Sequence, residues 1–260
     1  MSLHLRNGTT EQNGHKQPGK QMSIDLLAVE QLRMLAMRID QASRQRALRV
    51  IAVTSSVAGE GKTTIATNLA MIMARLFGKK TLLIDGDFRR PAISKVLKGE
   101  ITHGLVEVLK GQVIPADARW QVMDKLLTVL PLVKPELDGA TLLSNPEARA
   151  RFREVTEGFD CVIVDTPPAL PLADTNLLAE LFDGILFVVK AEHTPRRLIA
   201  SAVKNLPQDK FLGFVLNNTK TFGTAAYDYH YYGHGNYYGN NFNNRTVMQK
   251  ESNGNTESRG

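Results

Sequence analysis

Cysteine is almost absent from this sequence. Its single cysteine, Cys161, stands inside an apolar run, which excludes a disulfide framework and favours a reducing compartment. No apolar run reaches the ~20 residues that a membrane-spanning helix needs. The first twenty residues also lack the apolar core of a signal peptide. We therefore expect a soluble, cytoplasmic protein.

Basic and acidic residues are unevenly placed. The net charge is +6, and residues 1–50 contribute about +4 of it, with eight Lys or Arg against four Asp or Glu. This excess could face anionic lipid or an acidic partner, or it could be the solvated face of a helix. Basic and aromatic residues do not alternate there, so the sequence does not favour a nucleic acid partner.

Tyrosine is missing from the first 220 residues. All six tyrosines follow Lys220, in a Gly- and Asn-rich segment that cannot bury a core: Tyr227, Tyr229, Tyr231, Tyr232, Tyr237 and Tyr238. Such a tail could self-associate, as low-complexity aromatic segments do, or stack on single-stranded nucleic acid. A third interpretation is that the tyrosines are exposed acceptors for a phosphoryl group.

The most informative stretch is the loop that follows the apolar run near residue 50 and precedes a helical pattern. An apolar run, residues 50–53, is followed by a small-residue loop and then by a helical pattern, which is the arrangement of a phosphate-binding loop. Glycine lets successive N–H groups point at phosphate oxygens, and the helix adds the positive end of its dipole. Ser56 stands where the pattern usually has glycine, and an ordinary helix-capping turn is the alternative. The residues expected to bind nucleotide here are Gly59, Glu60, Gly61, Lys62, Thr63 and Thr64.

Two carboxylates follow the next apolar run, residues 81–84. Asp85 and Asp87 stand at its end, with Arg89 beyond. In open parallel sheets, ligands bind outside the carboxyl ends of the strands, so these acids should face the phosphate loop. Acids placed there can hold Mg²⁺ or accept a proton from an attacking hydroxyl. The alternative is that they only end a strand and cap a turn.

A third carboxylate has the same placement. Asp165 ends the apolar run at residues 161–164, and the double proline at 167–168 stops the strand. A carboxylate placed there can reach a metal ion opposite Thr63, as in the Walker B motif. Beside the phosphate loop, an acid at this position favours a metal-assisted nucleotide site.

Strand and helix patterns alternate along the rest of the chain. They predict helices at 23–46, 63–77, 104–111, 145–157, 173–182 and 196–206, strands at 126–130, 184–190 and 211–216, and a loop at 134–143. We expect an α/β fold with a doubly wound, mostly parallel sheet. The domains would be a disordered segment 1–22, a P-loop domain 23–220 and a flexible tail 221–260. Asn217, at the end of the last strand, could bind an adenine edge or belong to a turn.

Three motifs in this order, ahead of a tyrosine cluster, resemble the bacterial tyrosine autokinases of polysaccharide export: SSVAGEGKTT, LLIDGDFRRP and VIVDTPP. The resemblance implies a P-loop fold that uses ATP and Mg²⁺ and phosphorylates its own tail tyrosines between subunits. Lys62 and Thr63 match Walker A, Asp85 and Asp87 a second Walker A-like motif, and Asp165 Walker B. The family implies that Mg²⁺ is held around Thr63 and these three acids, Asp85, Asp87 and Asp165. It also implies that one of the acids helps to deprotonate the incoming tyrosine, and we favour Asp85 over Asp87.

The resemblance also implies partners. The family's subunit-contact helix carries Glu-x-x-Arg-x-x-Arg, and here Glu30 and Arg33 match, whereas Ala36 replaces the second arginine. A homo-oligomeric ring is expected from this match and put in doubt by Ala36. The chain resembles the free-standing type, which needs a separate membrane-spanning chain-length regulator as its activator. The protein would then lie at the inner face of the membrane and control polysaccharide polymerisation and export.

The main alternative is a positioning ATPase of the ParA/MinD kind, a switch without kinase activity. Those proteins carry a signature lysine five residues before the P-loop lysine, and this chain has Val57 there. The tyrosine tail also argues against this alternative. A scaffold that binds nucleotide without turnover is a third possibility, which the full set of acids makes less attractive.

Overall fold

The computed structural model describes residues 26–97, 102–122, 126–170 and 179–218. These residues belong to the first of two compact units, Met1–Lys220. The predicted segment 1–22, the tail 221–260 with its six tyrosines, and most of the helix expected at 173–182 lie outside the described residues. Within the described residues, no helix is both long enough and apolar enough to cross a bilayer.

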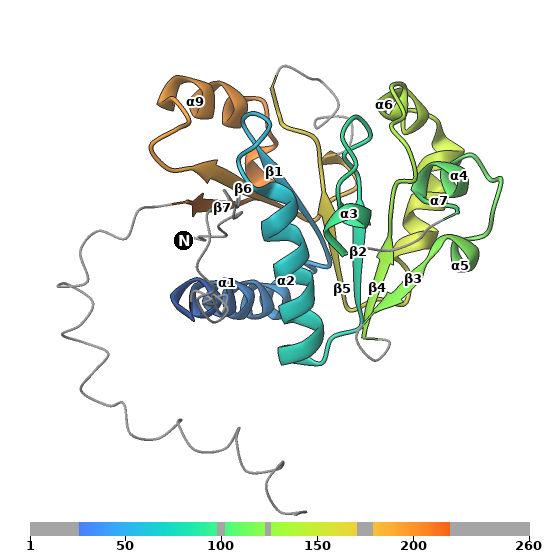
Figure 1. The fold of residues 1–260 in the computed structure, drawn as a ribbon, viewed down its shortest axis with the longest axis horizontal. Helices are drawn as coiled ribbons and strands as arrows, with labels where there is room; N and C mark the ends of the chain where they lie inside the picture. Colours follow the sequence, from blue (N-terminus) through green and yellow to red (C-terminus); the bar gives the residue numbers. More distant parts are fainter. Residues whose placement is uncertain (1–25, 98–101, 123–125, 171–178, 219–260) are drawn as a thin grey trace, which may run out of the picture. The chain divides into compact units, whose positions relative to one another are not determined.

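A seven-stranded sheet forms the centre of the fold, with strand order β3-β4-β2-β5-β1-β6-β7 (Figure 1). The strands are β1 Val50–Ser55, β2 Thr81–Asp85, β3 Trp120–Val122, β4 Leu127–Leu130, β5 Cys161–Asp165, β6 Gly184–Lys190 and β7 Phe211–Asn217. Every pairing is parallel except that of β3 with β4. The expected α/β, mostly parallel sheet is confirmed.

Strand β3 is a strand that the sequence pattern does not reveal. It has three residues, and it pairs antiparallel with β4 at the sheet edge, where Trp120 lies opposite Val129. A strand this short shows no measurable alternation of apolar and polar residues. Its position at the edge covers one side of β4 and leaves the phosphate-loop strands in the interior of the sheet.

Helices cover both faces of the sheet (Figure 1). They are α1 Leu26–Gln45, α2 Lys62–Phe77, α3 Ile93–Leu97, α4 Leu105–Leu109, α5 Pro115–Ala118, α6 Gly139–Leu142, α7 Pro146–Thr156 and α9 Arg196–Lys204, with a 3₁₀ turn at Gln208–Lys210. Helices α1 and α2 pack against one another and share one apolar cluster, whereas α4, α7 and α9 contribute to the other.

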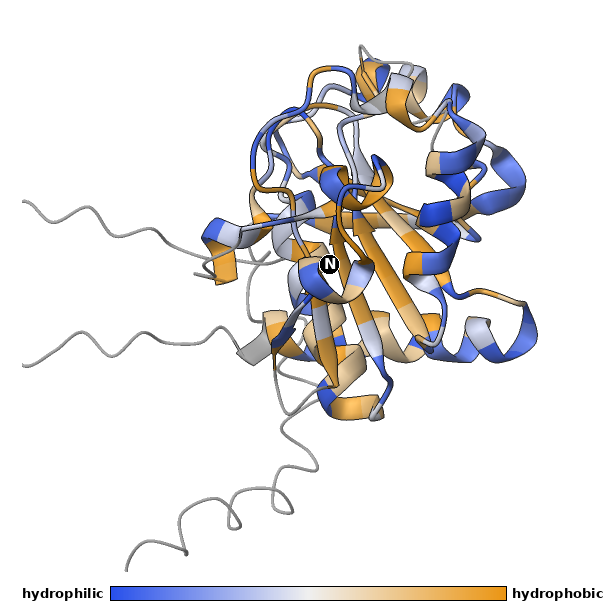
Figure 2. Ribbon diagram, turned by 90° about the vertical axis from the view of Figure 1, so that its right-hand side faces the viewer, coloured by the Kyte–Doolittle hydropathy of each residue, from blue (hydrophilic) through white to orange (hydrophobic). Residues whose placement is uncertain are grey.

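The two apolar clusters follow from the alternation of side chains along the strands. On β1, Val50 and Ala52 face one cluster, and Ile51 and Val53 face the other. Because both faces are covered, apolar side chains occupy both faces of the central strands, as expected for a parallel sheet (Figure 2).

The expected helices at 63–77 and 145–157 are confirmed, and the expected loop at 134–143 is wrong. Gly78 ends α2 in the left-handed conformation, and the Asn145 side chain caps α7 by accepting from the Glu147 N–H at 2.8 Å. The expected loop at 134–143 contains helix α6 instead. This helix begins where Gly139 lies against the Phe88 ring, and a Cβ at residue 139 would come within 2.2 Å of that ring. A helix of four residues is too short to show a helical period of apolar residues, so the sequence does not predict it.

Candidate functional site

The phosphate loop connects the end of β1 to the start of α2, at the carboxyl edge of the parallel strands (Figure 1). Gly59 and Gly61 have φ values of 85° and 96°, which glycine adopts without strain. A Cβ on Gly61 would lie 2.1 Å from the side-chain nitrogen of Asn217. Glycine at 61 is therefore needed both for the turn and for the approach of the last strand.

Lys62 and Thr63 begin helix α2 next to acidic side chains. The Lys62 side chain is buried, and its Nζ lies 3.5 Å from Oδ2 of Asp87. The Thr63 hydroxyl donates to Oδ2 of Asp165 at 2.5 Å. The structure thus brings together Lys62, Thr63, Asp87 and Asp165, which lie up to 103 positions apart in the sequence (62 to 165).

Asp165, like Asp85, is a fully buried carboxylate of the site. It has no solvent exposure, and its Oδ1 has no hydrogen-bond partner. Burial raises the pKa of Asp165 to about 7, against the opposing effects of the Lys62 ammonium and the Thr63 hydroxyl. A buried carboxylate oxygen without a partner is costly, and a bound cation is one way to satisfy it.

Asp85 is held by the backbone of the segment that follows it. Its carboxylate accepts from the N–H groups of Asp87 at 3.3 Å, Ala92 at 2.9 Å and Ile93 at 3.0 Å, so it caps helix α3. Burial nevertheless raises the pKa of Asp85 to about 6, because desolvation outweighs these bonds. The alternative role as a cap, left open by the sequence, is present in the structure.

Gly86 lets these acids approach the neighbouring strand. Its N–H donates to the Asp165 carbonyl at 2.7 Å, and a Cβ at this position would lie 2.9 Å from that oxygen. Asp87 follows directly and points its Oδ2 at Lys62, while its Oδ1 accepts from the Arg90 N–H at 3.1 Å. The Asp-Gly-Asp sequence therefore places one carboxylate in a helix cap and the other beside the phosphate-loop lysine.

Asn217, at the end of β7, contacts the phosphate loop at Glu60. The Asn217 side-chain amide donates to the Glu60 carbonyl at 2.9 Å, so the end of β7 touches the phosphate loop. The contact of Asn217 with an adenine edge stays a prediction. The carboxylate of Glu60 is turned toward the end of β6, where it accepts from the Lys190 N–H at 3.3 Å and from the Thr194 hydroxyl. Neither Lys190 nor Thr194 carries a sequence signal that would have singled it out.

The residues at this edge fit a magnesium ion. Asp87 lies beside Lys62, and Asp165 has an unpartnered oxygen next to the Thr63 hydroxyl. No cluster of three or more His, Cys, Asp or Glu with metal-site geometry occurs within the described ranges. Such a sparse set suits Mg²⁺, which proteins bind through one or two carboxylates together with waters and substrate phosphates.

The predicted subunit-contact residues lie on helix α1. Arg33 donates to Glu30 at 2.5 Å, and both side chains are about half exposed. Ala36, which replaces the second arginine of the family motif, is fully buried in the cluster shared with α2. Met34 and Met37 are exposed on the same helix, at 49% and 56%.

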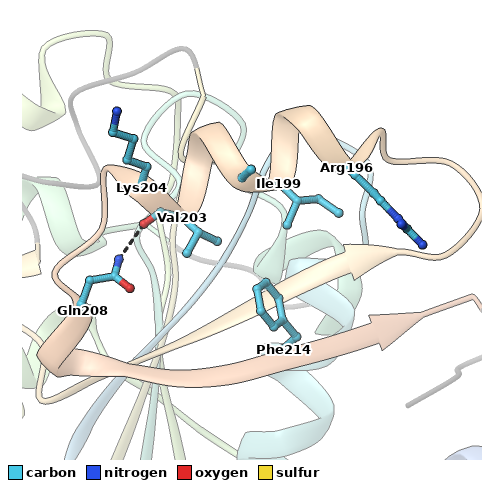
Figure 3. Close-up of a pocket in the computed structure, with 7 residues that line it drawn as sticks. Arg196, Ile199, Val203, Lys204, Gln208 and Phe214 are labelled. Atoms are coloured by element: carbon cyan, nitrogen blue, oxygen red, sulfur yellow. Dashed lines mark hydrogen bonds between the residues drawn. The ribbon is translucent and has the colours of Figure 1, made fainter.

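Two hollows lie away from the phosphate loop. One, of about 500 Å³, lies between α9 and β7 (Figure 3) and is lined by Arg196, Ile199, Ala200, Val203, Lys204, Gln208 and Phe214. The other, of about 850 Å³, lies near the starts of the strands, and its lining includes Asp40, Lys79, Asp160 and Asp183. Neither contains a residue that the sequence assigns to the site.

Comparison with known proteins gives consistent results. Residues 48–205 match the AAA domain family. The tyrosine-protein kinase YwqD of Bacillus subtilis is 33% identical over 225 residues, which cover 83% of this chain and 94% of that protein. The succinoglycan biosynthesis transport protein ExoP of Rhizobium meliloti is 35% identical over 196 residues, 73% of this chain and 25% of ExoP. The solved VpsO kinase domain superposes with a TM-score of 0.67 at 27% identity, covering 75% of this chain and 98% of that domain.

Proposed function

This chain belongs to the AAA domain family and, within it, to the tyrosine-protein kinases of bacterial capsule and exopolysaccharide biosynthesis; we propose that it transfers the γ-phosphoryl group of MgATP to the tyrosines of its own tail. The observation that carries the proposal is the unpartnered, buried Oδ1 of Asp165 beside Thr63 at the phosphate loop. A positioning ATPase is disfavoured by the family to which the chain belongs.

The residues of the site divide the work of phosphoryl transfer. The N–H groups of the phosphate loop and the Lys62 ammonium would bind the phosphates, and Thr63 and Asp165, which lie side by side, would hold Mg²⁺. Bound Mg²⁺ supplies positive charge that offsets the charge of the transferring phosphoryl group. Because catalysis of this reaction is mostly positioning and electrostatics, the buried setting of these side chains increases their effect.

We assign the orientation of the incoming tyrosine to Asp87 rather than to Asp85, which the sequence favoured. Asp85 is fully buried, and its carboxylate already accepts three backbone N–H groups. Asp87 keeps an oxygen directed at Lys62, where the transferring group would lie. In this scheme the tyrosine hydroxyl gives its proton to Asp87 as its oxygen bonds to phosphorus, and ADP leaves with the Lys62 ammonium at its phosphates.

The acceptors in the proposal are the six tail tyrosines, Tyr227, Tyr229, Tyr231, Tyr232, Tyr237 and Tyr238. They are the protein's only tyrosines, which supports a dedicated role for the segment. Transfer between two copies is part of the proposal. The contact between copies would use the exposed face of α1, with Glu30, Arg33 and the exposed Met34 and Met37.

The partner in the proposal is a membrane-spanning chain-length regulator that activates the kinase and holds it at the inner membrane face. The relationship to a transport protein of succinoglycan biosynthesis supports a link to a membrane system. Phosphorylation of the tail would then control polymer synthesis and export. When the kinase is purified from cells that also express the regulator, we expect the regulator to be recovered with it. The regulator should not be recovered from cells that lack the kinase.

Intact mass after incubation with MgATP tests the kinase assignment. The wild-type chain should gain phosphate in steps, mapped to tyrosines 227–238, and Lys62→Met should gain none. Lys110→Met is a matched control, because Lys110 also forms an ion pair but lies outside the phosphate loop. Its Nζ is 2.6 Å from Oε2 of Glu136. Equal phosphate on wild type and on Lys62→Met, purified free of other kinases, would refute the assignment.

A mixing experiment tests transfer between copies. A full-length chain with all six tyrosines changed to Phe keeps the site and lacks acceptors, while Lys62→Met keeps the acceptors and lacks the lysine. Mixed with MgATP, the Lys62→Met chain should become phosphorylated at a rate that rises with concentration. If it stays unmodified while the wild type labels itself, transfer occurs within one copy.

A further inference from the structure

The carboxylate of Glu60 is buried inside the phosphate loop and faces away from the phosphate side. Glu60 is 2% exposed, and its Oε2 accepts from the Val57 N–H at 2.7 Å, within the same loop. Its Oε1 accepts from the N–H of Lys190, the last residue of β6, and from the hydroxyl of Thr194, which follows that strand. One side chain therefore joins the turn of the phosphate loop to the chain that leaves β6.

The backbone of Glu60 is joined to a second segment. Its carbonyl accepts from the Asn217 amide at 2.9 Å, and the Asn217 carbonyl in turn accepts from the Ala191 N–H at 2.8 Å. Gly61 leaves no space for a side chain between the loop and Asn217. The phosphate loop, the end of β6 and the end of β7 thus form one hydrogen-bonded unit centred on Glu60.

The two segments joined to Glu60 contain unusual backbone conformations. Glu192 and Asn218, both with φ of 57°, are the two non-glycine residues of positive φ found in the described part of the chain. Glutamate rarely adopts this conformation, which persists only where surrounding contacts enforce it. Here the Lys190 carbonyl accepts from the N–H groups of His193 and Thr194, which closes the turn around Glu192. The positive φ values of Glu192 and Asn218 therefore indicate that the backbone of the two segments bonded to Glu60 is held in a defined conformation.

We propose that Glu60 is a positioning residue that holds the phosphate loop in its phosphate-binding shape by tying it to Thr194 and Lys190. A carboxylate in an anion-binding loop would repel phosphate if it faced the ligand, so its inward direction is consistent with a role through other groups. This inference rests on the proposed nucleotide site and adds a residue to it. The sequence alone would assign Glu60 to the nucleotide itself.

Paired substitutions separate this role from packing. Glu60→Gln keeps the shape but presents an amide to donors on both sides, so at least one buried N–H loses its acceptor. Thr194→Val removes the hydroxyl that donates to Glu60, and Thr194→Ser keeps that hydroxyl. Glu107→Gln is the matched control, because Glu107 also accepts a backbone N–H, that of Gly104 at 3.0 Å, in helix α4.

The measurement is the dissociation constant of the full chain for MgATP and for magnesium tripolyphosphate, with the unfolding midpoint recorded alongside. Glu60→Gln should weaken both ligands by about tenfold, since one charge-assisted bond is lost. Thr194→Val should weaken both by a smaller factor, and the double variant should bind like Glu60→Gln because the two changes break one bridge. Thr194→Ser and Glu107→Gln should bind like wild type.

Three results would overturn the inference. Unchanged binding with a lowered midpoint would make Glu60 merely structural. Weaker binding of MgATP with unchanged binding of magnesium tripolyphosphate would mean that Glu60 acts on the adenosine part of ATP. Additive effects of the two substitutions in the double variant would show that Glu60 and Thr194 do not act through one bridge. If Glu60→Gln does not fold, the comparison of Thr194→Val with Thr194→Ser decides. Binding is measured without transfer, so a chain that binds MgATP and modifies no tyrosine would refute the proposed kinase function and leave this inference standing.

Discussion

The two ends of the same parallel sheet treat carboxylates in opposite ways. At the amino ends of the strands, Asp183 accepts from the N–H groups of Arg49 and Val50, and Asp160 accepts from the Lys80 N–H. Asp40, near the same end, pairs with Lys79 at 2.5 Å, and this bond holds the pKa of Asp40 below its ordinary value. These acids have partners that stabilise their charge.

At the carboxyl ends of the strands, burial dominates. Burial raises the pKa of Asp165 to about 7 and that of Asp85 to about 6, and Lys62 is the cation that opposes it at Asp165. Among the described residues, the carboxylates whose pKa burial raises lie at this end, beside the phosphate loop. Acids whose charge is stabilised by N–H groups or cations stabilise the chain, whereas acids whose charge is opposed mainly by burial are available to a metal–nucleotide complex.

The largest expected effect comes from removing the least compensated charge. Asp165→Asn should lower the rate of tyrosine phosphorylation by about 100- to 1,000-fold, because Mg²⁺ loses its carboxylate. The same change should raise the stability of the metal-free protein at pH 8 by about 1–3 kcal/mol, since a buried charge is removed. Chemical denaturation and single-turnover kinetics measure the two effects. A variant less stable than wild type would contradict the contrast between the two ends.

The pH dependence of stability should show the same contrast. Asp165 and Asp85 have folded pKa values above the unfolded value of 3.8, so their contribution is complete below pH 4 and is lost as pH rises through about 6 and 7. We expect the metal-free protein to lose about 7 kcal/mol from these groups over that range, about 4 from Asp165 and about 3 from Asp85, at about 1.4 kcal/mol for each pKa unit. Denaturant titrations of wild type and Asp165→Asn from pH 4 to 8 measure this loss. An equal slope in both proteins would exclude Asp165 as a source.

Asp40→Asn tests the other end of the sheet and should have a smaller effect of opposite sign. It should destabilise the protein by about 1–2 kcal/mol at pH 7, because Lys79 and Arg44 lose their acceptor. The folded pKa of Asp40 is lowered, so this loss should shrink as pH falls below 4. The dissociation constant for MgATP, measured in parallel, should be unchanged. Weaker nucleotide binding would mean that the two ends are not independent.

The smallest effect is expected on the exposed face of α1. Arg33→Ala should change the free energy of unfolding by less than about 0.5 kcal/mol, because its pair with Glu30 is half exposed and screened by solvent. Light scattering with and without MgATP tests whether the variant still forms oligomers. Reduced oligomer size with unchanged stability would support a subunit contact there, and equal size would remove Arg33 from it.

The sequence predicts the sheet and the phosphate loop because both depend on local patterns. Three or four apolar residues followed by Asp85 or Asp165 define a buried strand and its functional end, and both strands form as expected. Strand β3 and helix α6 escape prediction because three or four residues show no period. Their formation depends on tertiary contacts, such as Gly139 against Phe88.

Side-chain partners in the site are harder to predict than its members. The spacing of the motifs does not say that Asp85 caps helix α3 or that Glu60 turns away from the phosphate side. Both outcomes depend on which backbone N–H groups come near once the loops have folded. Ala36 is similar, since its burial against α2 follows from how α1 packs and not from the family motif.

The most direct test of the central claim is the stabilisation that Mg²⁺ adds to bound ATP. The unfolding midpoint is measured at pH 8 with ATP and EDTA, and again with ATP and Mg²⁺, for wild type and Asp165→Asn. If the acids at the carboxyl edge await a metal–nucleotide complex, Mg²⁺ should raise the midpoint of wild type and add little to the variant. An equal increment in both proteins would show that Asp165 does not hold the metal and would contradict the account.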